Sequence, residues 1–270
     1  MSRSNPTELA PNPAVKFFEW NGDAGHFFYF DKTIGEKGAK VDVKLPFTFL
    51  FLDGLVTVKG FSDQHQKGFY SNEIRDLKTQ KLNVRMGKDT VELGLYEEIK
   101  DRLAKIGASY TQSVYIAFKE GDKLVIGNVN FKGASLGPWI DFKNKVKGQI
   151  NEKAVRIKST LEGKKGKVVY QMPVFELCDV SEATNKEAVE LDKQLQAYLT
   201  EYLSKSHSKS IEREEAQSVQ PEIHQPELTE DEKLFMVKSE SPDTDLSELA
   251  NQGMDLVEGF TQDDSDDLPF

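Results

Sequence analysis

The stretch VDVKLPFTFLFLDGLVTVKGF, residues 41–61, carries the strongest β-strand pattern in the chain. A long apolar run from Val41 to Leu52 is followed by Asp53-Gly54, and a second run rich in β-branched residues continues to Phe61. Asp-Gly between two such runs is a strong short-range signal for a β-hairpin, because both residues accept the positive φ of a two-residue turn. The stretch therefore predicts two antiparallel strands joined at residues 53–54.

Further strand signals occur on both sides of this stretch. The aromatic residues at 17–20 and 27–30 are separated by the turn Asn21-Gly22-Asp23, which predicts a first hairpin. Two more hairpins are predicted to turn at Glu120-Gly121-Asp122 and within residues 163–166. The strands together occupy most of the chain up to residue 180, so the ordered domain is predicted to be mainly β.

Three segments carry helical patterns instead. Apolar residues recur every three or four positions over 95–106 and stop before Gly107, which predicts a helix there. Pro138 can open a short helix that continues to Val146. A capping-box pattern at Thr184 and an apolar stripe over 185–204 predict a C-terminal helix, which packs on the β domain or pairs with another subunit.

Composition divides the chain into four parts. Residues 1–13 are polar and contain three prolines, which indicates a disordered arm; 14–180 form the β domain, and 181–205 contain the C-terminal helix. Residues 206–270 are predicted to be disordered, because their low hydrophobicity and high net charge leave too little apolar surface to offset the entropy of ordering. The strands and one or two inserted helices favour an elaborated β-barrel resembling the OB-fold, with a β-sandwich as the alternative.

The sequence argues against several classes of site. Cys178 is the single cysteine and the four histidines are scattered, so we expect no disulfide, metal or cofactor. There is no P-loop, GxGxxG, HExxH or GxSxG motif, so the chain is not predicted to be an enzyme. The first residues lack an apolar signal region, and there is no apolar run of about 20 residues, so we expect a cytoplasmic protein that does not enter membranes.

Charge is distributed unevenly along the chain. Residues 1–180 carry 28 Lys and Arg against 22 Asp and Glu, a net of +6. Residues 181–270 carry 7 Lys and Arg against 23 Asp and Glu, a net of −16. A basic body with an acidic tail is typical of nucleic-acid-binding proteins, although a solubilising tail on an unrelated domain has the same pattern.

The chain ends in QDDSDDLPF, residues 262–270, which resembles the acidic tip of bacterial single-stranded DNA-binding proteins. In that family the tip docks on replication, recombination and repair enzymes. The resemblance implies that the body binds single-stranded DNA without sequence specificity and that the tip recruits such enzymes. The tip residues to which it assigns docking are Asp263, Asp264, Asp266, Asp267, Leu268, Pro269 and Phe270.

The chemistry of the tip suits this role. Phe270 offers an aromatic anchor, Pro269 restricts the backbone before binding, and the terminal carboxylate can pair with an Arg or Lys of a partner. The aspartates favour basic surfaces in a salt-sensitive way, and they can compete with DNA for the protein's own basic surface. Because the β domain is longer than the bacterial one and the linker is not Gly-rich, the plan is more similar to divergent phage-encoded single-stranded DNA-binding proteins, which act in the host cytoplasm.

Binding a strand of any sequence requires cations for the phosphates and exposed rings for the bases, with about 1–3 kcal/mol per stacked base. Residues 68–75 are the most attractive segment, because they place rings, an amide and an Arg in one predicted loop. For each ring the alternative is a core position, and for each lysine a solvated surface. The candidate contacts are Trp20, Phe28, Lys44, Lys59, Phe61, Tyr70, Asn72, Arg75, Arg85, Lys119, Lys132 and Trp139.

Two other functions are compatible with the same sequence. An adaptor or scaffolding protein would use the C-terminal helix and the tail, and it would show no salt-dependent affinity for DNA. OB barrels also bind RNA, so an RNA-binding protein is the second alternative. Neither alternative requires an active site, and a homo-oligomer is compatible with all three functions.

Overall fold

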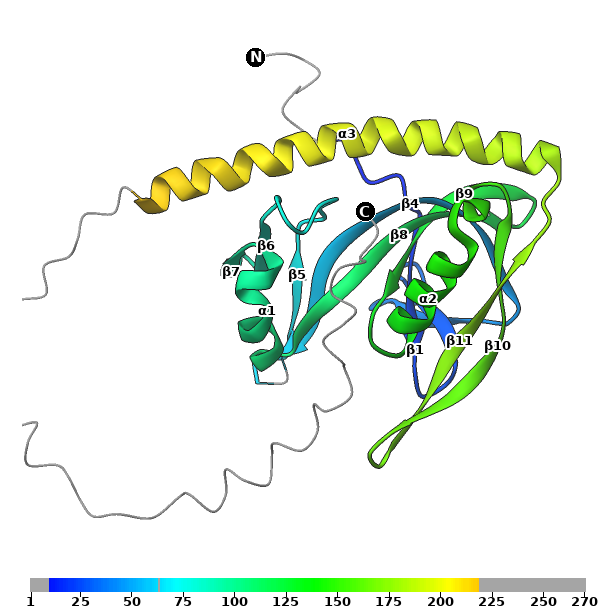
Figure 1. Ribbon diagram of the computed structural model, residues 1–270, viewed down its shortest axis with the longest axis horizontal. Coiled ribbons are helices and arrows are strands. Elements are labelled where there is room, and N and C mark those ends of the chain that lie inside the picture. Colours follow the sequence, from blue (N-terminus) through cyan, green and yellow to red (C-terminus); the bar gives the residue numbers. More distant parts are fainter. Residues whose placement is uncertain (1–9, 63, 219–270) are drawn as a thin grey trace, which may run out of the picture. The chain divides into compact units, whose positions relative to one another are not determined.

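The computed structural model describes residues 10–62 and 64–218. The chain divides into two units, 1–215 and 216–270, and of the second unit only 216–218 are described. The described residues form eleven strands and three helices (Figure 1). The strands are β1 (Lys16–Asn21), β2 (His26–Asp31), β3 (Ala39–Val43), β4 (Phe47–Ser62), β5 (Lys67–Ser71), β6 (Leu82–Met86), β7 (Asp89–Gly94), β8 (Ala108–Glu120), β9 (Lys123–Phe131), β10 (Ala154–Lys165) and β11 (Val168–Cys178).

The helices begin within three residues of their predicted starts, but the last one continues to Ser218, past its predicted end at 204 and into the segment predicted to be disordered. They are α1 (Tyr96–Lys105), α2 (Leu136–Val146) and α3 (Glu182–Ser218), with two short 3₁₀ helices, η1 (Gly133–Ser135) and η2 (Lys147–Asn151). The residue that caps α3 differs from the predicted one, because the Oγ of Ser181 accepts the backbone N–H of Thr184 at 3.2 Å. The apolar stripe of α3 packs on the sheet of its own chain.

All eleven strands belong to one sheet. Its main order is β3-β2-β1-β9-β8-β4-β5-β6-β7, and β10 pairs with both β4 and β11. The pairing of β1 with β9 is parallel and the other pairings are antiparallel. The mainly β prediction is confirmed, but the described strands do not close into the predicted barrel, because β3 and β7 end the order unpaired with each other.

Strand β4 takes the place of the hairpin predicted at Asp53-Gly54. It continues from Phe47 to Ser62 and pairs with β8 along most of its length. The pairing shifts by one residue between Phe51 and Asp53, which is a β-bulge-type irregularity. The hairpin prediction is therefore wrong, because pairing with β8 holds the Asp-Gly pair in a bulge that bends one long strand.

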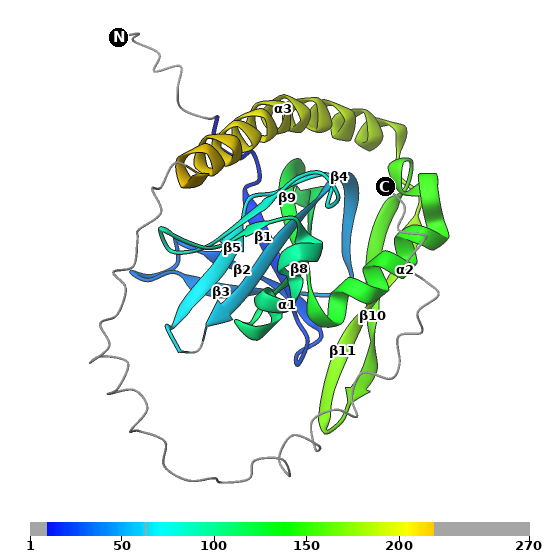
Figure 2. The same ribbon diagram turned by 60° about the vertical axis from the view of Figure 1, so that its left-hand side comes forward.

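The other edge of β4 has two different neighbours, and this divides the sheet. Phe47–Phe49 pair with β10, whereas Lys59–Ser62 pair with β5. The hairpin β10–β11 therefore extends from one end of β4, and β5, β6 and β7 extend from the other (Figure 1, Figure 2). Among residues 10–62 and 64–218 no strand joins these two branches, which is the structural reason that the described sheet stays open.

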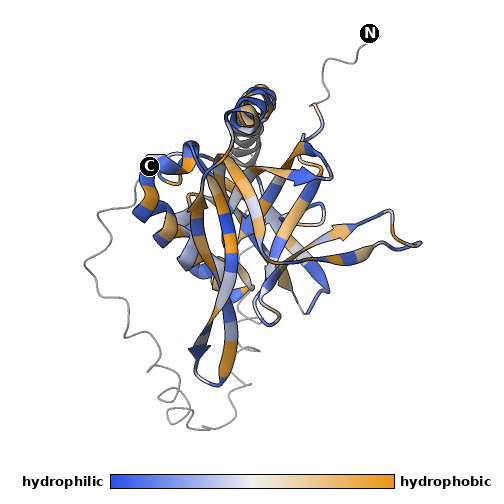
Figure 3. Cartoon of the chain, turned by 90° about the vertical axis from the view of Figure 1, so that its right-hand side faces the viewer, coloured by the Kyte–Doolittle hydropathy of each residue, from blue (hydrophilic) through white to orange (hydrophobic). Residues whose placement is uncertain are grey.

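One face of the sheet, here called the apolar face, contains two hydrophobic clusters. Successive side chains of a strand point to opposite faces, so alternate residues of β8 define each face. Val114, Ile116 and Phe118 point to the apolar face, where the first cluster includes Trp139 of α2. Ala108 points to the same face at the other end of β8 and joins the second cluster with Ile99 of α1. The alternation of apolar and polar residues along the strands is visible in Figure 3.

The opposite face, here called the polar face, is defined by Ser109, Thr111 and Ser113 of β8 and by the side chains level with them on neighbouring strands. Helix α3 covers one end of this face, where Leu195 and Leu199 pack against the buried Tyr115. The segment before β1 reaches the same end, because Asn12 donates its side-chain N–H to the hydroxyl of Tyr115 at 3.0 Å. Asn12, which belongs to the arm predicted to be disordered, is therefore bonded to the sheet.

Candidate nucleic-acid interface

Both tryptophans belong to the core. The ring of Trp139 is fully buried and stacks on Phe131 with a centroid distance of 4.5 Å, and its Nε1–H donates to the side-chain oxygen of Gln112 at 3.0 Å. Trp20 is 8% exposed and donates its Nε1–H to the carbonyl of Gln171 at 2.8 Å. Neither ring is available to stack with a base, so the prediction of both as contact residues is corrected by their positions on the apolar face.

Arg75 has a structural partner. Its guanidinium donates to both carboxylate oxygens of Asp53, at 3.0 and 2.7 Å, and to the side-chain oxygen of Gln196 on α3 at 3.3 Å. Burial alone would raise the pKa of Asp53, but the hydrogen bonds from Arg75 and Gln196 lower it below its ordinary value. These three side chains, here called the Asp53 clamp, connect the bulge of β4 to α3.

The segment 68–75 is not the single loop that the sequence predicts. Its first part belongs to β5, and Ile74 forms an isolated bridge with Val56. The side chain of Asn72 bonds to the backbone, accepting from the N–H of Asn83 at 2.7 Å and donating to the carbonyl of Lys81 at 3.1 Å. The amide of Asn72 thus links β5 to the start of β6 rather than facing a ligand.

Two of the predicted lysines lie away from the others. Lys44 is exposed directly after β3, the edge strand of the main order. Lys119 is exposed near the end of β8, and the α3-covered residues Tyr115 and Ala117 separate it from Ser109. The structure does not bring these two lysines to the remaining candidates.

Besides Arg75 and Lys119, which lie at the α3-covered end, six of the twelve candidates lie on the polar face. The register pairs Lys59 of β4 with Tyr70 of β5 and Tyr70 with Arg85 of β6, so the three side chains form one row across the sheet. Ser109 of β8 lies at the other side of Lys59 in the same row. The six residues are Phe28, Lys59, Phe61, Tyr70, Arg85 and Lys132.

Two of these rings are open to solvent beside the cations. Phe61 is 51% exposed and follows Lys59 by two positions on β4, which places it on the same face. Tyr70 is 45% exposed, and its hydroxyl donates to the backbone carbonyl of Gly87, which holds the ring at this edge. The row of Ser109, Lys59, Tyr70 and Arg85, with Phe61 beside it, is here called the Lys59 row.

A second row crosses the polar face on strands β2, β1, β9 and β8. Phe28 of β2 is level with Glu19 of β1, Glu19 with Asn130 of β9, and Asn130 with Ser113 of β8. Glu19 forms an ion pair with Lys132 at 3.1 Å. The Phe28 ring has the ammonium of Lys40 4.7 Å from its centroid, so one side of that ring already holds a cation.

The two rows are electrostatically linked through Lys59. Burial lowers the pKa of the Lys59 ammonium below its ordinary value, while the carboxylates of Glu19 and Glu73 act in the opposite direction. Lys132 adds a like charge that lowers the pKa of Lys59 further. Glu19, Glu73 and Lys132 therefore all lie near enough to Lys59 to influence its charge.

Glu73 is a buried carboxyl group of this face that the sequence did not indicate. Its carboxylate accepts hydrogen bonds from the hydroxyl of Ser113 and from that of Tyr115, the latter at 2.9 Å. Its backbone N–H donates to the hydroxyl of Tyr202 on α3 at 2.9 Å. Burial raises the pKa of Glu73, and these hydrogen bonds oppose the increase. No local pattern marks this residue, because its partners are far apart in sequence.

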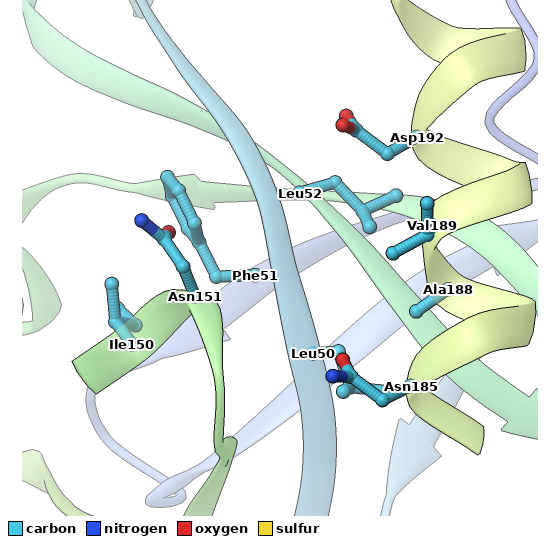
Figure 4. Close-up of a pocket in the computed structure, with 9 residues that line it drawn as sticks. All are labelled: Leu50, Phe51, Leu52, Ile150, Asn151, Asn185, Ala188, Val189 and Asp192. Atoms are coloured by element: carbon cyan, nitrogen blue, oxygen red, sulfur yellow. The ribbon is translucent and has the colours of Figure 1, made fainter. Parts of the chain in front are cut away.

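A separate cavity of about 260 Å³ lies between β4, η2 and the first turns of α3 (Figure 4). Six of its nine lining residues are apolar, and the polar ones are Asn151, Asn185 and Asp192. Leu52 and Val189 approach each other across it, whereas Asp192 lies at its rim (Figure 4). The cavity contains none of the predicted contact residues and brings no cation, so it does not suit a phosphate chain.

The described residues lack both a membrane-spanning helix and a cluster of metal-binding side chains. Among residues 10–62 and 64–218, no helix is both long and apolar enough to cross a membrane. The same residues contain no group of three or more His, Cys, Asp or Glu side chains placed to hold a metal ion.

The acidic tip, residues 262–270, lies outside the described part of the chain. In comparisons with protein families, curated proteins and solved structures, no match to the chain was found.

Proposed function

We propose that the chain binds single-stranded DNA along the polar face of its sheet and recruits replication, recombination and repair enzymes through its acidic tip. The observation that carries the proposal is the Lys59 row, in which the strand register sets two exposed rings, Phe61 and Tyr70, beside Lys59 and Arg85. Rings that stack on bases and cations that neutralise phosphates are the two requirements for binding a single strand of any sequence.

The dimensions of the row suit a few nucleotides. Neighbouring strands are about 4.8 Å apart, so the four side chains from Ser109 to Arg85 span about 14 Å. Stacking contributes about 1–3 kcal/mol per base and does not depend on which base is present. Each phosphate that is neutralised on a single strand changes the slope of log K against log salt concentration by about −0.7. Contacts from Lys59, Arg85 and Lys132 therefore predict a slope of about −2.

The proposal for the tip has a different basis. It rests on the resemblance of residues 262–270 to the tip of bacterial single-stranded DNA-binding proteins and on the net charge of −16 over residues 181–270. The adaptor alternative shares this tail but predicts no affinity of the body for DNA. RNA binding would use the same rings and cations, so it is distinguished by competition rather than by the geometry of the polar face.

The test is a titration of the intact chain against a fluorescently labelled oligothymidylate, followed by anisotropy at several salt concentrations. We expect binding that weakens as salt rises, and a matched oligouridylate competitor that is less effective than unlabelled oligothymidylate. Absence of salt-dependent binding at low ionic strength would overturn the proposal and favour the adaptor function. Stronger competition by the RNA would replace DNA with RNA as the ligand.

A further inference from the structure

The polar face contains one buried side-chain amide whose donor and acceptor both lack a hydrogen-bond partner within the described part of the chain. Asn130 lies on β9, level with Glu19 on one side and Ser113 on the other. The residue is 1% exposed, yet neither its side-chain oxygen nor its side-chain nitrogen has a hydrogen-bond partner among the described residues. The side-chain oxygen of Asn128, two positions earlier on the same face, is also without one.

This arrangement is energetically unfavourable unless a partner is supplied. A buried polar group left without a hydrogen bond costs about 1–3 kcal/mol, and Asn130 has a donor group and an acceptor in that state. Buried polar groups in folded proteins are nearly always satisfied, so an exception indicates a bound molecule or a function. The position of Asn130 within the second row of the proposed DNA-binding face points to a ligand of that face.

Two long polar side chains neighbour Asn130 on this face. Lys132 follows it by two positions in extended backbone and pairs with Glu19 at 3.1 Å, and these two side chains are 33% and 35% exposed. Long side chains of this kind can move without a change in the sheet, whereas the strands on both sides of Asn130 cannot. Separation of the Glu19–Lys132 pair would open Asn130 to a ligand and free the Lys132 ammonium for a phosphate.

A ring stands beside the amide. Phe17 is level with Asn128 and precedes Glu19 by two positions, so its side chain points to the polar face, and it is 46% exposed. Phe17 is not among the residues that the sequence reasoning selected. A base that stacks on Phe17 would lie next to Asn128, the residue level with Phe17 on β9.

We propose that Asn130 hydrogen-bonds to the Watson–Crick edge of one nucleobase of the bound strand. A side-chain amide presents a donor beside an acceptor, which is the complement of that edge in each of the four bases, and bidentate amide–base pairs are a general mode of base recognition. This inference rests on the proposed function and deepens it, because it adds a hydrogen bond to one base edge, whichever base is present, to the stacking and phosphate contacts of the Lys59 row. The unpaired side-chain oxygen of Asn128 would accept a further hydrogen bond from the same base edge.

The test compares oligothymidylate with the same oligomer built from N3-methylthymidine, which keeps the charge and the stacking rings but loses the donor of the edge. The intact chain should bind the methylated oligomer about five- to a hundredfold more weakly, which is the range for one good base pair with a side chain. Asn130→Ala should bind the two oligomers equally. Asn144→Ala, on the exposed side of α2, is the matched control and should keep the full difference.

Each outcome decides between the two proposals. If the intact chain binds neither oligomer, the proposed function fails. If it binds both equally well, strand binding stands but base reading at Asn130 is overturned, and an ordered water then satisfies the amide. If Asn130→Ala keeps the difference between the oligomers, another residue reads the base and the assignment to Asn130 is wrong. Asn130→Ser leaves a smaller polar group in the sheet, and it replaces the alanine variant if thermal unfolding shows that the latter does not fold.

Discussion

The two faces of the sheet bury their side chains in opposite ways. On the apolar face, polar groups are few and paired, as where the indole N–H of Trp139 meets Gln112 at 3.0 Å. On the polar face, Ser113, Asn128 and Asn130 are each about 1% exposed, and two of them keep unpaired atoms. A face that contributes only to stability would not hold open donors and acceptors, because each lowers the free energy of unfolding. The apolar face therefore mainly contributes stability, whereas the polar face is the one on which we propose that the strand binds.

The largest expected effect tests the stability side of this comparison. Trp139→Ala removes a fully buried ring that stacks on Phe131, and we expect the free energy of unfolding to fall by about 3–5 kcal/mol. Equilibrium denaturation with urea measures this change. A decrease below about 1 kcal/mol would show that the apolar face is not the main source of stability.

The next effect concerns the connection between the sheet and α3. Asp53→Asn removes the charge that pairs with Arg75 and Gln196 in the Asp53 clamp, and hydrogen bonds to charged groups contribute about 1.5–3 kcal/mol. We expect the free energy of unfolding to fall within this range, because the amide leaves Arg75 without its counter-charge. Asp141→Asn, on the exposed surface of α2, is the control and should change stability little. Equal changes in the two variants would show that the Asp53 clamp does not stabilise the folded chain.

The third effect tests the recognition side. Tyr70→Ala removes one exposed ring of the Lys59 row, and the loss of one stacked base should weaken oligothymidylate binding by about 1–3 kcal/mol, or about five- to a hundredfold. Because the ring is 45% exposed, the free energy of unfolding should change much less than in Trp139→Ala. Leu161→Ala, an exposed apolar position on β10, should leave binding unchanged. If both variants bind as the native chain does, the Lys59 row is not the contact surface.

The smallest effect is a pH dependence of stability that arises from the polar face. Burial raises the pKa of Glu73 in the folded chain above its value in the unfolded chain, so the folded state holds this proton to higher pH. Its contribution to stability is therefore complete below the unfolded pKa of about 4.3 and is lost as pH rises through the raised folded pKa. The Tm of Glu73→Gln minus the Tm of the native chain should therefore increase as pH rises through this window. Parallel Tm curves between pH 4.5 and 8 would contradict the raised pKa.

Local sequence patterns predicted the positions of helices and strands better than they predicted which strands pair with one another. The helix over 95–106 and the hairpin between β1 and β2 follow from periodicity and from turn residues, which depend on neighbours in sequence. The Asp53-Gly54 prediction failed because pairing with β8, more than fifty residues later, decides whether that dipeptide turns or bulges. The open sheet likewise depends on β4 having β10 at one end and β5 at the other.

The candidate site shows the same division. Aromatic and basic residue types were sufficient to select Phe61, Tyr70 and Arg85, but the same rule selected Trp20 and Trp139, which lie in the core. The difference between these residues is the face of the sheet to which they point. Glu73, Phe17 and Asn130 were not selected, because their significance comes from residues level with them on other strands.

The amino-acid sequence by itself determined the mainly β character of residues 14–180, the positions of the three helices, and the separation of a basic body from an acidic tail. These properties depend on composition and on patterns within about ten residues. The tertiary structure alone decided the course of β4, the open sheet, and the meeting of Lys59, Tyr70 and Arg85 in one row. The physical reason is that strand register sets which side chains share a face, and register is settled by hydrogen bonds between distant segments.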